Sequence, residues 1–360
     1  MNYRTLTALV LALLLSGACA RASAQAGDAP LTNEEFLRLV RQLPRQPSLK
    51  EEIIKEVRRR GIGFPLTNGL RSIVATKSGN DVDLRRTLEE AERRRLDPAS
   101  AAPPSVAEAE TVLGRAREET LAAAQAMPDF VVKQLIRRSH SLNRTRNWQT
   151  SDRLIVGVSY RARGGEQYRL LAVNGIPAAP DERERGSYSQ VGGMTSAGEF
   201  VSVLLMIFGE RERAEFKLAD TDTLRGRRTL VFEYAVKREN SNYRLQIHGG
   251  REVVTGYRGR VWIDRENFRV LRAESVAVNI PADFPIKSAV TTIDYDWVAI
   301  AGQQYLLPAR SVAELTSPSG DQMIAERNDI LFRGYQKFGT ELKIIEEDII
   351  EGEPPPEEKP

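Results

Sequence analysis

The stretch Tyr257–Ile280, YRGRVWIDRENFRVLRAESVAVNI, decides the fold of this 360-residue chain. Val261 and Ile263 share one face of an extended segment and Trp262 lies on the other, which is the period-2 pattern of a half-buried strand. The polar triplet 265–267 turns the chain, and the segment after it is rich in the β-branched and aromatic residues that favour strands. The stretch therefore predicts a β-hairpin.

Similar alternating runs occur on both sides of this hairpin and are separated by turn residues. The pair Asn174-Gly175 is a strong hairpin signal because both residues accept positive φ, and Ala301-Gly302 marks another turn. These runs predict about eleven strands. We expect all of them to be antiparallel, because only one connection between them contains a helix.

That helix is predicted over residues 196–208, SAGEFVSVLLMIF. Ser196 and Glu199 match a capping box, and the sequence beyond them is apolar on nearly all sides, which predicts burial on most sides. The chain is therefore expected to have an α+β fold, in which this helix covers or plugs a curved, half-barrel-like sheet. The residues expected to contact an apolar ligand are Phe200, Leu204, Leu205, Met206 and Phe208.

Residues 31–96 have the pattern of a small bundle of four short helices. Thr32 with Glu35 and Ser48 with Glu51 match capping boxes, in which the hydroxyl and the carboxylate each accept a hydrogen bond from a free amide. Apolar residues follow each box at helical spacing. Two helices are therefore expected to begin at these motifs.

The third helix is expected to begin at Thr67 and the fourth at Asp81. Residues 97–104, DPASAAPP, have the small residues and prolines of a linker. We expect the antiparallel β domain over residues 105–346, opened by a helix that covers the sheet. The acidic, proline-rich residues 347–360 are expected to be disordered.

Residues 1–26 have the features of a secretory signal peptide. Arg4 precedes an apolar run, and small residues up to Ala26 provide a cleavage site. A lipoprotein anchored through Cys19 stays open as an alternative, although Ser16 stands where a lipobox has a large aliphatic residue. We therefore expect an exported protein that is periplasmic or peripherally associated with the envelope or outer membrane.

Charge and cysteine content exclude several kinds of partner and chemistry. Removal of the leader takes away Arg4 and Arg21 and lowers the net charge from +3 to +1, so no overall charge attracts nucleic acid or anionic membranes. Cys19 is the one cysteine of the chain, so cleavage after Ala26 leaves no disulfide and no thiol chemistry. No other stretch has the eighteen consecutive apolar residues of a membrane-spanning helix.

Few side chains offer catalytic or metal-binding chemistry. The two histidines, His140 and His248, lie far apart in the sequence and have no neighbouring cysteine, so no metal cluster or catalytic triad is predicted. Asp294 and Asp296 have the spacing to share one face of a strand, where they would bind a cation or act as the acid and base of glycoside hydrolysis. A solvated outer face is the favoured interpretation. No catalytic residue and no cofactor is predicted.

Several segments of residues 106–346 resemble a family of exported proteins of acidobacterial type, a resemblance that implies no activity. They are PDFVVKQLIRRSH, GGMTSAGEF, YRGRVWIDRENFRVLR, IPADFPIKSAVTTIDYDWVAI, QYLLPARS and FRGYQKFG. More remotely, the order of helix then strands and the G-x-V-W-I-D hairpin are similar to the periplasmic lipoprotein carriers of the LolA/LolB-like superfamily. That resemblance implies a half-open barrel whose helical lid covers acyl chains.

Three functions stay open on the sequence alone. The favoured one is a non-enzymatic envelope protein that binds a lipid or a lipidated partner against the curved sheet. The second is an envelope scaffold or interaction protein with a filled core, and the third is a hydrolase that uses Asp294 and Asp296. An apolar cavity of several hundred Å3 would favour the first function over the second.

Overall fold

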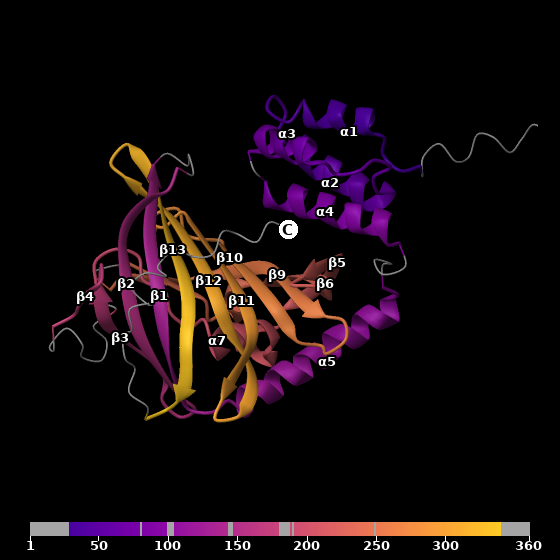
Figure 1. Ribbon diagram of the computed structural model, residues 1–360. Coiled ribbons are helices and arrows are strands. Elements are labelled where there is room, and N and C mark those ends of the chain that lie inside the picture. Colours follow the sequence, from indigo (N-terminus) through magenta and orange to yellow (C-terminus); the bar gives the residue numbers. More distant parts are fainter. Residues whose placement is uncertain are drawn as a thin grey trace, which may run out of the picture. The chain divides into compact units, whose positions relative to one another are not determined.

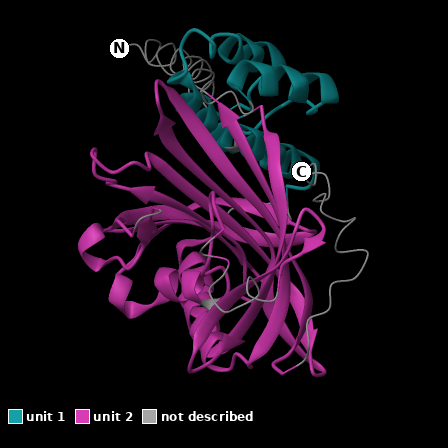
Figure 2. Cartoon of the chain, turned by 90° about the vertical axis from the view of Figure 1, so that its left-hand side faces the viewer, with its two compact units in different colours: residues 1–102, 360 teal, residues 103–359 magenta. Residues whose placement is uncertain are grey.

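The computed structural model describes residues 29–79, 81–98, 104–142, 147–179, 188, 191–247 and 250–339. The expected signal peptide with Cys19, most of the expected linker, His248 and the expected acidic tail lie outside these residues. The chain divides into two compact units, residues 1–102 and 103–359, which Figure 2 shows in different colours.

The described part of the first unit contains four short helices. They are α1 (Asn33–Val40), α2 (Leu49–Arg60), α3 (Asn68–Ser78) and α4 (Val82–Leu96). The capping box at Thr32 is confirmed, since Thr32 Oγ1 accepts the Glu35 amide at 3.2 Å and Glu35 Oε2 accepts the Thr32 amide at 3.3 Å. The box expected at Ser48 is wrong. Ser48 has helical backbone angles instead of extended ones, so its hydroxyl does not reach an amide of the first turn.

The second unit is organised around an eleven-stranded antiparallel sheet (Figure 1), in agreement with the predicted fold class. Its strands follow the order β4-β3-β2-β1-β13-β12-β11-β10-β9-β6-β5. They are β1 (Phe130–Leu142), β2 (Gln149–Arg161), β3 (Gly165–Val173), β4 (Ile176–Pro177), β5 (Glu215–Leu224), β6 (Arg227–Val236), β9 (Gly256–Asp264), β10 (Val270–Val278), β11 (Ser288–Ile300), β12 (Gln303–Ser319) and β13 (Gln322–Lys337). A separate pair, β7 (Arg244–Gln246) and β8 (Glu252–Val254), forms a two-stranded sheet.

The predicted central hairpin is formed by β9 and β10. At its turn, Asp264 Oδ1 accepts the amides of Glu266 at 2.8 Å and Asn267 at 3.2 Å. Gly259 is required in β9, because a Cβ at this position would come 1.7 Å from the carbonyl oxygen of Glu274 on β10. The absence of a side chain at Gly259 therefore permits the close pairing of the two strands.

The inner face of the sheet carries one continuous row of paired, buried residues. This row consists of Leu154, Ile136, Ile330, Ser311, Ile293, Ala273, Val261 and Phe232, one from each of eight neighbouring strands. The register is strongly specified, since a shift by one residue would turn all of these side chains to the outer face.

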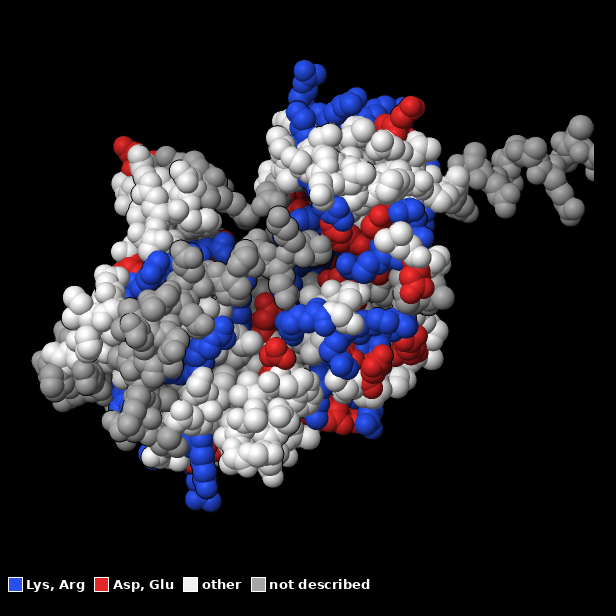
Figure 3. All heavy atoms as spheres, in the orientation of Figure 1, with Lys and Arg blue, Asp and Glu red and all other residues white. Residues whose placement is uncertain are grey.

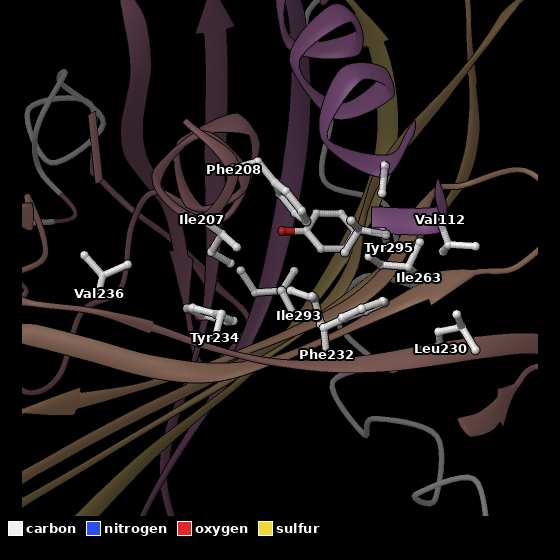
Figure 4. Close-up of a cluster of buried hydrophobic side chains, with 14 of the residues drawn as sticks. Val112, Ile207, Phe208, Leu230, Phe232, Tyr234, Val236, Ile263, Ile293 and Tyr295 are labelled. Atoms are coloured by element: carbon white, nitrogen blue, oxygen red, sulfur yellow. The ribbon is translucent and has the colours of Figure 1, made fainter. Parts of the chain in front are cut away.

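Two helices, α5 (Val106–Gln125) and α7 (Val201–Phe208), cover this inner face. Figure 4 shows Tyr295 of β11 between Ile207 and Phe208 of α7 on one side and Val112 of α5 on the other, with Ile293 of β11 below. All five side chains are buried in one cluster. The concave side of the sheet is therefore occupied by helices that pack directly on the strands.

The outer face carries charged residues that pair across strands. Arg272 of β10 donates to Asp294 of β11 at 2.7 and 3.0 Å, and Arg310 of β12 donates to Asp329 of β13 at 3.2 Å. Figure 3 shows basic and acidic side chains interspersed over the face that it presents. Ion pairs thus make the outer face of the sheet compatible with water, whereas the inner face supplies the apolar core.

Candidate functional site

The helix that covers the sheet begins later than the sequence predicts. Helix α7 starts at Val201, and its N-cap is Phe200, whose side chain caps no amide. The predicted capping box of Ser196 and Glu199 is therefore wrong. Glu199 is 2% exposed and faces the polar interior beside β3, so it is not available to cap the helix.

The structure separates the five predicted ligand residues into two groups. Phe200 and Phe208 are each 1% exposed and belong to the core. The ring of Phe200 packs on those of Phe130 and Phe332, both at 5.3 Å between centroids.

The other three residues lie in the middle of α7. Leu204 and Met206 are half-buried, and Leu205 is 39% exposed. The expectation that this helix is buried on most sides is therefore met only in part. One side packs on the sheet, and the other brings an apolar surface to solvent.

A small apolar cavity lies beneath α7. Its volume is about 40 Å3. Its lining comes from α5, α7, β12 and the start of β10, and consists of Thr120, Ala123, Ala124, Met127, Phe200, Leu204, Arg269, Val270, Leu306 and Leu307. Binding sites for drug-sized ligands have volumes of roughly 300–1,000 Å3, so an acyl chain does not fit unless these elements move apart.

A cluster of polar side chains, two of them buried and two half-buried, lies at the start of α7. Glu166 and Tyr168 come from β3, Glu199 from the segment before α7, and Tyr188 packs on Tyr168 with 5.9 Å between the ring centroids. The Tyr168 hydroxyl donates to Glu166 Oε2 and lies 3.4 Å from Glu199 Oε2. The Gly198 amide lies 3.0 Å from both Glu166 Oε2 and the Tyr168 hydroxyl oxygen. Two carboxyl groups thus converge on one tyrosine hydroxyl.

The pKa values of both carboxyl groups are raised. Burial, and then the neighbouring Glu166, raise the pKa of Glu199 from 4.5 to about 7. Burial raises the pKa of Glu166, although hydrogen bonds from Tyr168 and Gly198 oppose this shift. Burial also raises the pKa of Tyr188 to about 12. The cluster therefore favours a state in which at least one carboxyl is neutral.

This cluster is not predicted from the sequence. Glu166 lies in a strand of alternating pattern, in which a polar residue is expected to face solvent. Ser196 and Glu199 have the spacing of a capping box, which predicts a different role for Glu199. The alternation of Glu166 and Tyr168 on one face, next to an inward-facing strand, was the one available signal. It does not reveal which distant segment covers that face.

The remaining candidate residues do not assemble into a site. Asp294 is engaged by Arg272, and Asp296 is exposed, with its Oδ1 accepting the Trp297 amide at 2.8 Å. His140 Nδ1 lies 2.9 Å from Ser151 Oγ on the next strand. Within the described ranges, no three His, Cys, Asp or Glu side chains are grouped as metal ligands would be.

The second unit thus belongs to the class of open, curved antiparallel sheets whose concave face is covered by helices. Among the described helices, none is both long enough and apolar enough to span a membrane.

No family model matches the chain, and no curated protein matches its sequence. Among solved structures, it is similar to an outer membrane lipoprotein-sorting protein domain from Vibrio parahaemolyticus, with 16% identity over 68% of this chain and 97% of that chain and a TM-score of 0.35. A DUF1329 family protein from Desulfovibrio piger has 11% identity over 64% of this chain and 95% of its own, with a TM-score of 0.29. A chain of the MucA/MucB complex of Pseudomonas aeruginosa has 12% identity over 60% of this chain and 93% of its own, with a TM-score of 0.18. These likenesses assign no ligand or partner to this chain, and its membership in a family of exported acidobacterial-type proteins stays a prediction.

Proposed function

We propose that this chain is an envelope protein that binds an apolar ligand, the acyl chain of a lipid or of a lipidated partner, between α7 and the concave face of the sheet. One observation carries the proposal. Helix α7, VSVLLMIF, has no charged residue, yet Leu205 is 39% exposed and its neighbours Leu204 and Met206 are half-buried. An apolar helix that is partly in water indicates a surface that meets an apolar partner.

The proposal requires α7 to act as a lid. The cavity of about 40 Å3 beneath it has space for water molecules but not for an acyl chain. Binding would therefore widen this cavity by moving α7 away from α5 and β12. Met206 favours such a surface, because its flexible side chain adapts to different apolar partners.

Replacement of two alanines of α5 by valine, one at a time, tests where the ligand enters. Ala124 lines the cavity, whereas Ala122, on the same helix, is exposed. Ala124→Val fills the cavity and is expected to weaken uptake of a fluorescent fatty acid at least tenfold, with Ala122→Val binding like the natural chain. Equal binding of the fatty acid by the two variants would show that its acyl chain does not enter beneath α7.

The small cavity favours a second candidate function. A scaffold or interaction protein needs a filled core and no ligand, and the packing of Phe200 and Phe208 fits such a core. The two functions differ in one property that is simple to measure. If no fatty acid is taken up at any pH, and no lipid is found by mass spectrometry in the purified protein, the scaffold function is supported instead.

A further inference from the structure

The segment before α7 is fastened to β3 by one carboxylate. Glu166 Oε2 accepts the Gly198 amide at 3.0 Å, and Glu166 Oε1 lies 3.4 Å from the Ser202 hydroxyl. Gly198 precedes the helix and Ser202 lies in its first turn, so Glu166 binds both sides of the helix start. An outward movement of α7 that lifts this segment from β3 must break these contacts.

A second carboxyl, Glu199, contacts the same tyrosine hydroxyl as Glu166, and the two contacts need one proton on the pair. A tyrosine hydroxyl has one hydrogen, and Tyr168 donates it to Glu166. The Tyr168 oxygen also accepts the Gly198 amide at 3.0 Å. The 3.4 Å contact between the Tyr168 oxygen and Glu199 Oε2 can therefore be a hydrogen bond together with the one to Glu166 only while one of the two carboxyls carries a proton.

The surroundings of Glu199 do not favour a second negative charge. Among the described residues, the titratable groups that face the pair are Tyr168 of β3, Tyr160 of β2, Tyr295 of β11, Tyr335 of β13 and Tyr188, and the cation Arg138 of β1 lies near Tyr188. Arg138 is the one cation of this set, and it already donates to Asp152 and to the Gly192 carbonyl oxygen. Ionisation of both glutamates would thus place two like charges side by side in a buried site.

We propose that Glu166 and Glu199 form a latch, which keeps α7 closed while the pair shares one proton and releases α7 when that proton is lost to solvent. The proposal rests on the proposed function, in which α7 is the lid. The latch acts directly on the lid because Glu199 is separated from the first helical residue only by Phe200.

The direction of the pH dependence follows from the pKa of Glu199. In the closed protein burial and Glu166 raise it from 4.5 to about 7, and in an opened protein the carboxyl meets water and returns toward 4.5. Between these two pH values the closed form holds the proton, whereas the open form has lost it. The ratio of closed to open protein therefore falls by up to about tenfold per pH unit as the pH rises through this window, and it is constant outside it.

The opening is measured directly by the distance between two spin labels. Leu205→Cys places one label on α7 and Gln303→Cys places the other at the exposed start of β12, in a full chain that also carries Cys19→Ser. We expect a single short distance at pH 5 and an added longer distance at pH 8. The chain with Glu199→Gln, whose amide donates to Tyr168 at every pH, is expected to show only the short distance at both.

Two further variants control the measurement. Glu233→Gln removes a carboxyl from the outer face, where it pairs with Arg260, and is expected to respond to pH like the natural chain. Tyr168→Phe removes the oxygen that the two carboxyls share and is expected to increase the open fraction at pH 5. It also provides a test of the latch if Glu199→Gln does not fold by circular dichroism.

The outcomes separate the latch from the proposed function. Identical distances at pH 5 and pH 8 in the natural chain, or the same response in the chain with Glu199→Gln, overturn the latch. If the distances change as expected but a fluorescent fatty acid is bound at neither pH, the latch is supported and ligand binding is contradicted. If the fatty acid is bound equally at both pH values and the distances do not change, ligand binding is supported and the latch is overturned.

Discussion

At the scale of single residues, Asp294 and Asp296 have unequal roles although they lie two positions apart. Asp294 neutralises Arg272, and both side chains are largely buried, at 15% and 22% exposure. Asp294→Asn should lower the free energy of unfolding by about 2–3 kcal/mol, because it leaves the guanidinium without its carboxylate. Asp296→Asn should change it by less than about 0.5 kcal/mol, since an amide oxygen accepts the Trp297 amide equally well.

Urea denaturation of the two variants checks this prediction. Equal stabilities would mean that the Arg272 pair does not contribute to the fold. A loss of turnover on a glycan or an ester in either variant would instead support the hydrolase alternative.

Single residues also show where prediction from the sequence ends. Turn residues with positive φ can be predicted from the sequence, and Asn174 and Gly175 have φ of 49° and 78° as their hairpin signal predicts. The role of Glu199 is not visible, because local spacing describes the neighbours along the chain and not the strand that packs on them. Its environment depends on β3, about thirty residues earlier in the chain.

At the scale of elements, the hairpin of β9 and β10 depends on a close approach at Gly259. An added Cβ would come 1.7 Å from the Glu274 carbonyl oxygen and 2.9 Å from the Tyr234 hydroxyl. Gly259→Ala should therefore lower the free energy of unfolding by about 3 kcal/mol or more.

Gly114→Ala is the matched control, because a Cβ there meets no atom within 4 Å in the helix α5. It should stabilise the protein by about 0.5–1 kcal/mol. Thermal or urea unfolding of the two variants measures both changes in the free energy of unfolding. If Gly259→Ala leaves this free energy unchanged, the described pairing of the two strands is contradicted.

The two sides of α7 are expected to differ in their contribution to stability. Phe200→Ala removes a ring that contacts Phe130 and Phe332 and should cost about 3–5 kcal/mol. Leu205→Ala changes an exposed side chain and should cost less than about 1 kcal/mol. Similar losses in urea unfolding would mean that the outer side of α7 is buried in solution.

Elements were predictable where a pattern is local. The central hairpin and the capping box at Thr32 appear as the sequence predicts, because strand alternation and helix caps involve residues close in the chain. The start of α7 and the exposure of Leu205 were not predictable. The apolar pattern of 196–208 shows that the segment avoids water, but it does not show which side meets the sheet.

At the scale of the whole molecule, each compact unit has its own apolar core. We therefore predict that residues 105–348 fold without residues 27–104, and that a purified fragment gives the β-type circular dichroism spectrum of the second unit. The loss of that spectrum in the fragment would show that the β domain needs the helical unit.

Binding of an acyl chain beneath α7 can be tested with a photoreactive fatty acid that carries a diazirine in the middle of its chain. After irradiation of the full protein at pH 8, peptide mass spectrometry locates the labelled residues. We expect labels on the residues that line the cavity, in α5 near Ala124, in α7 near Leu204 and in β12 near Leu307. Labels confined to the outer face of the sheet, or no label that an excess of unlabelled fatty acid displaces, would contradict it.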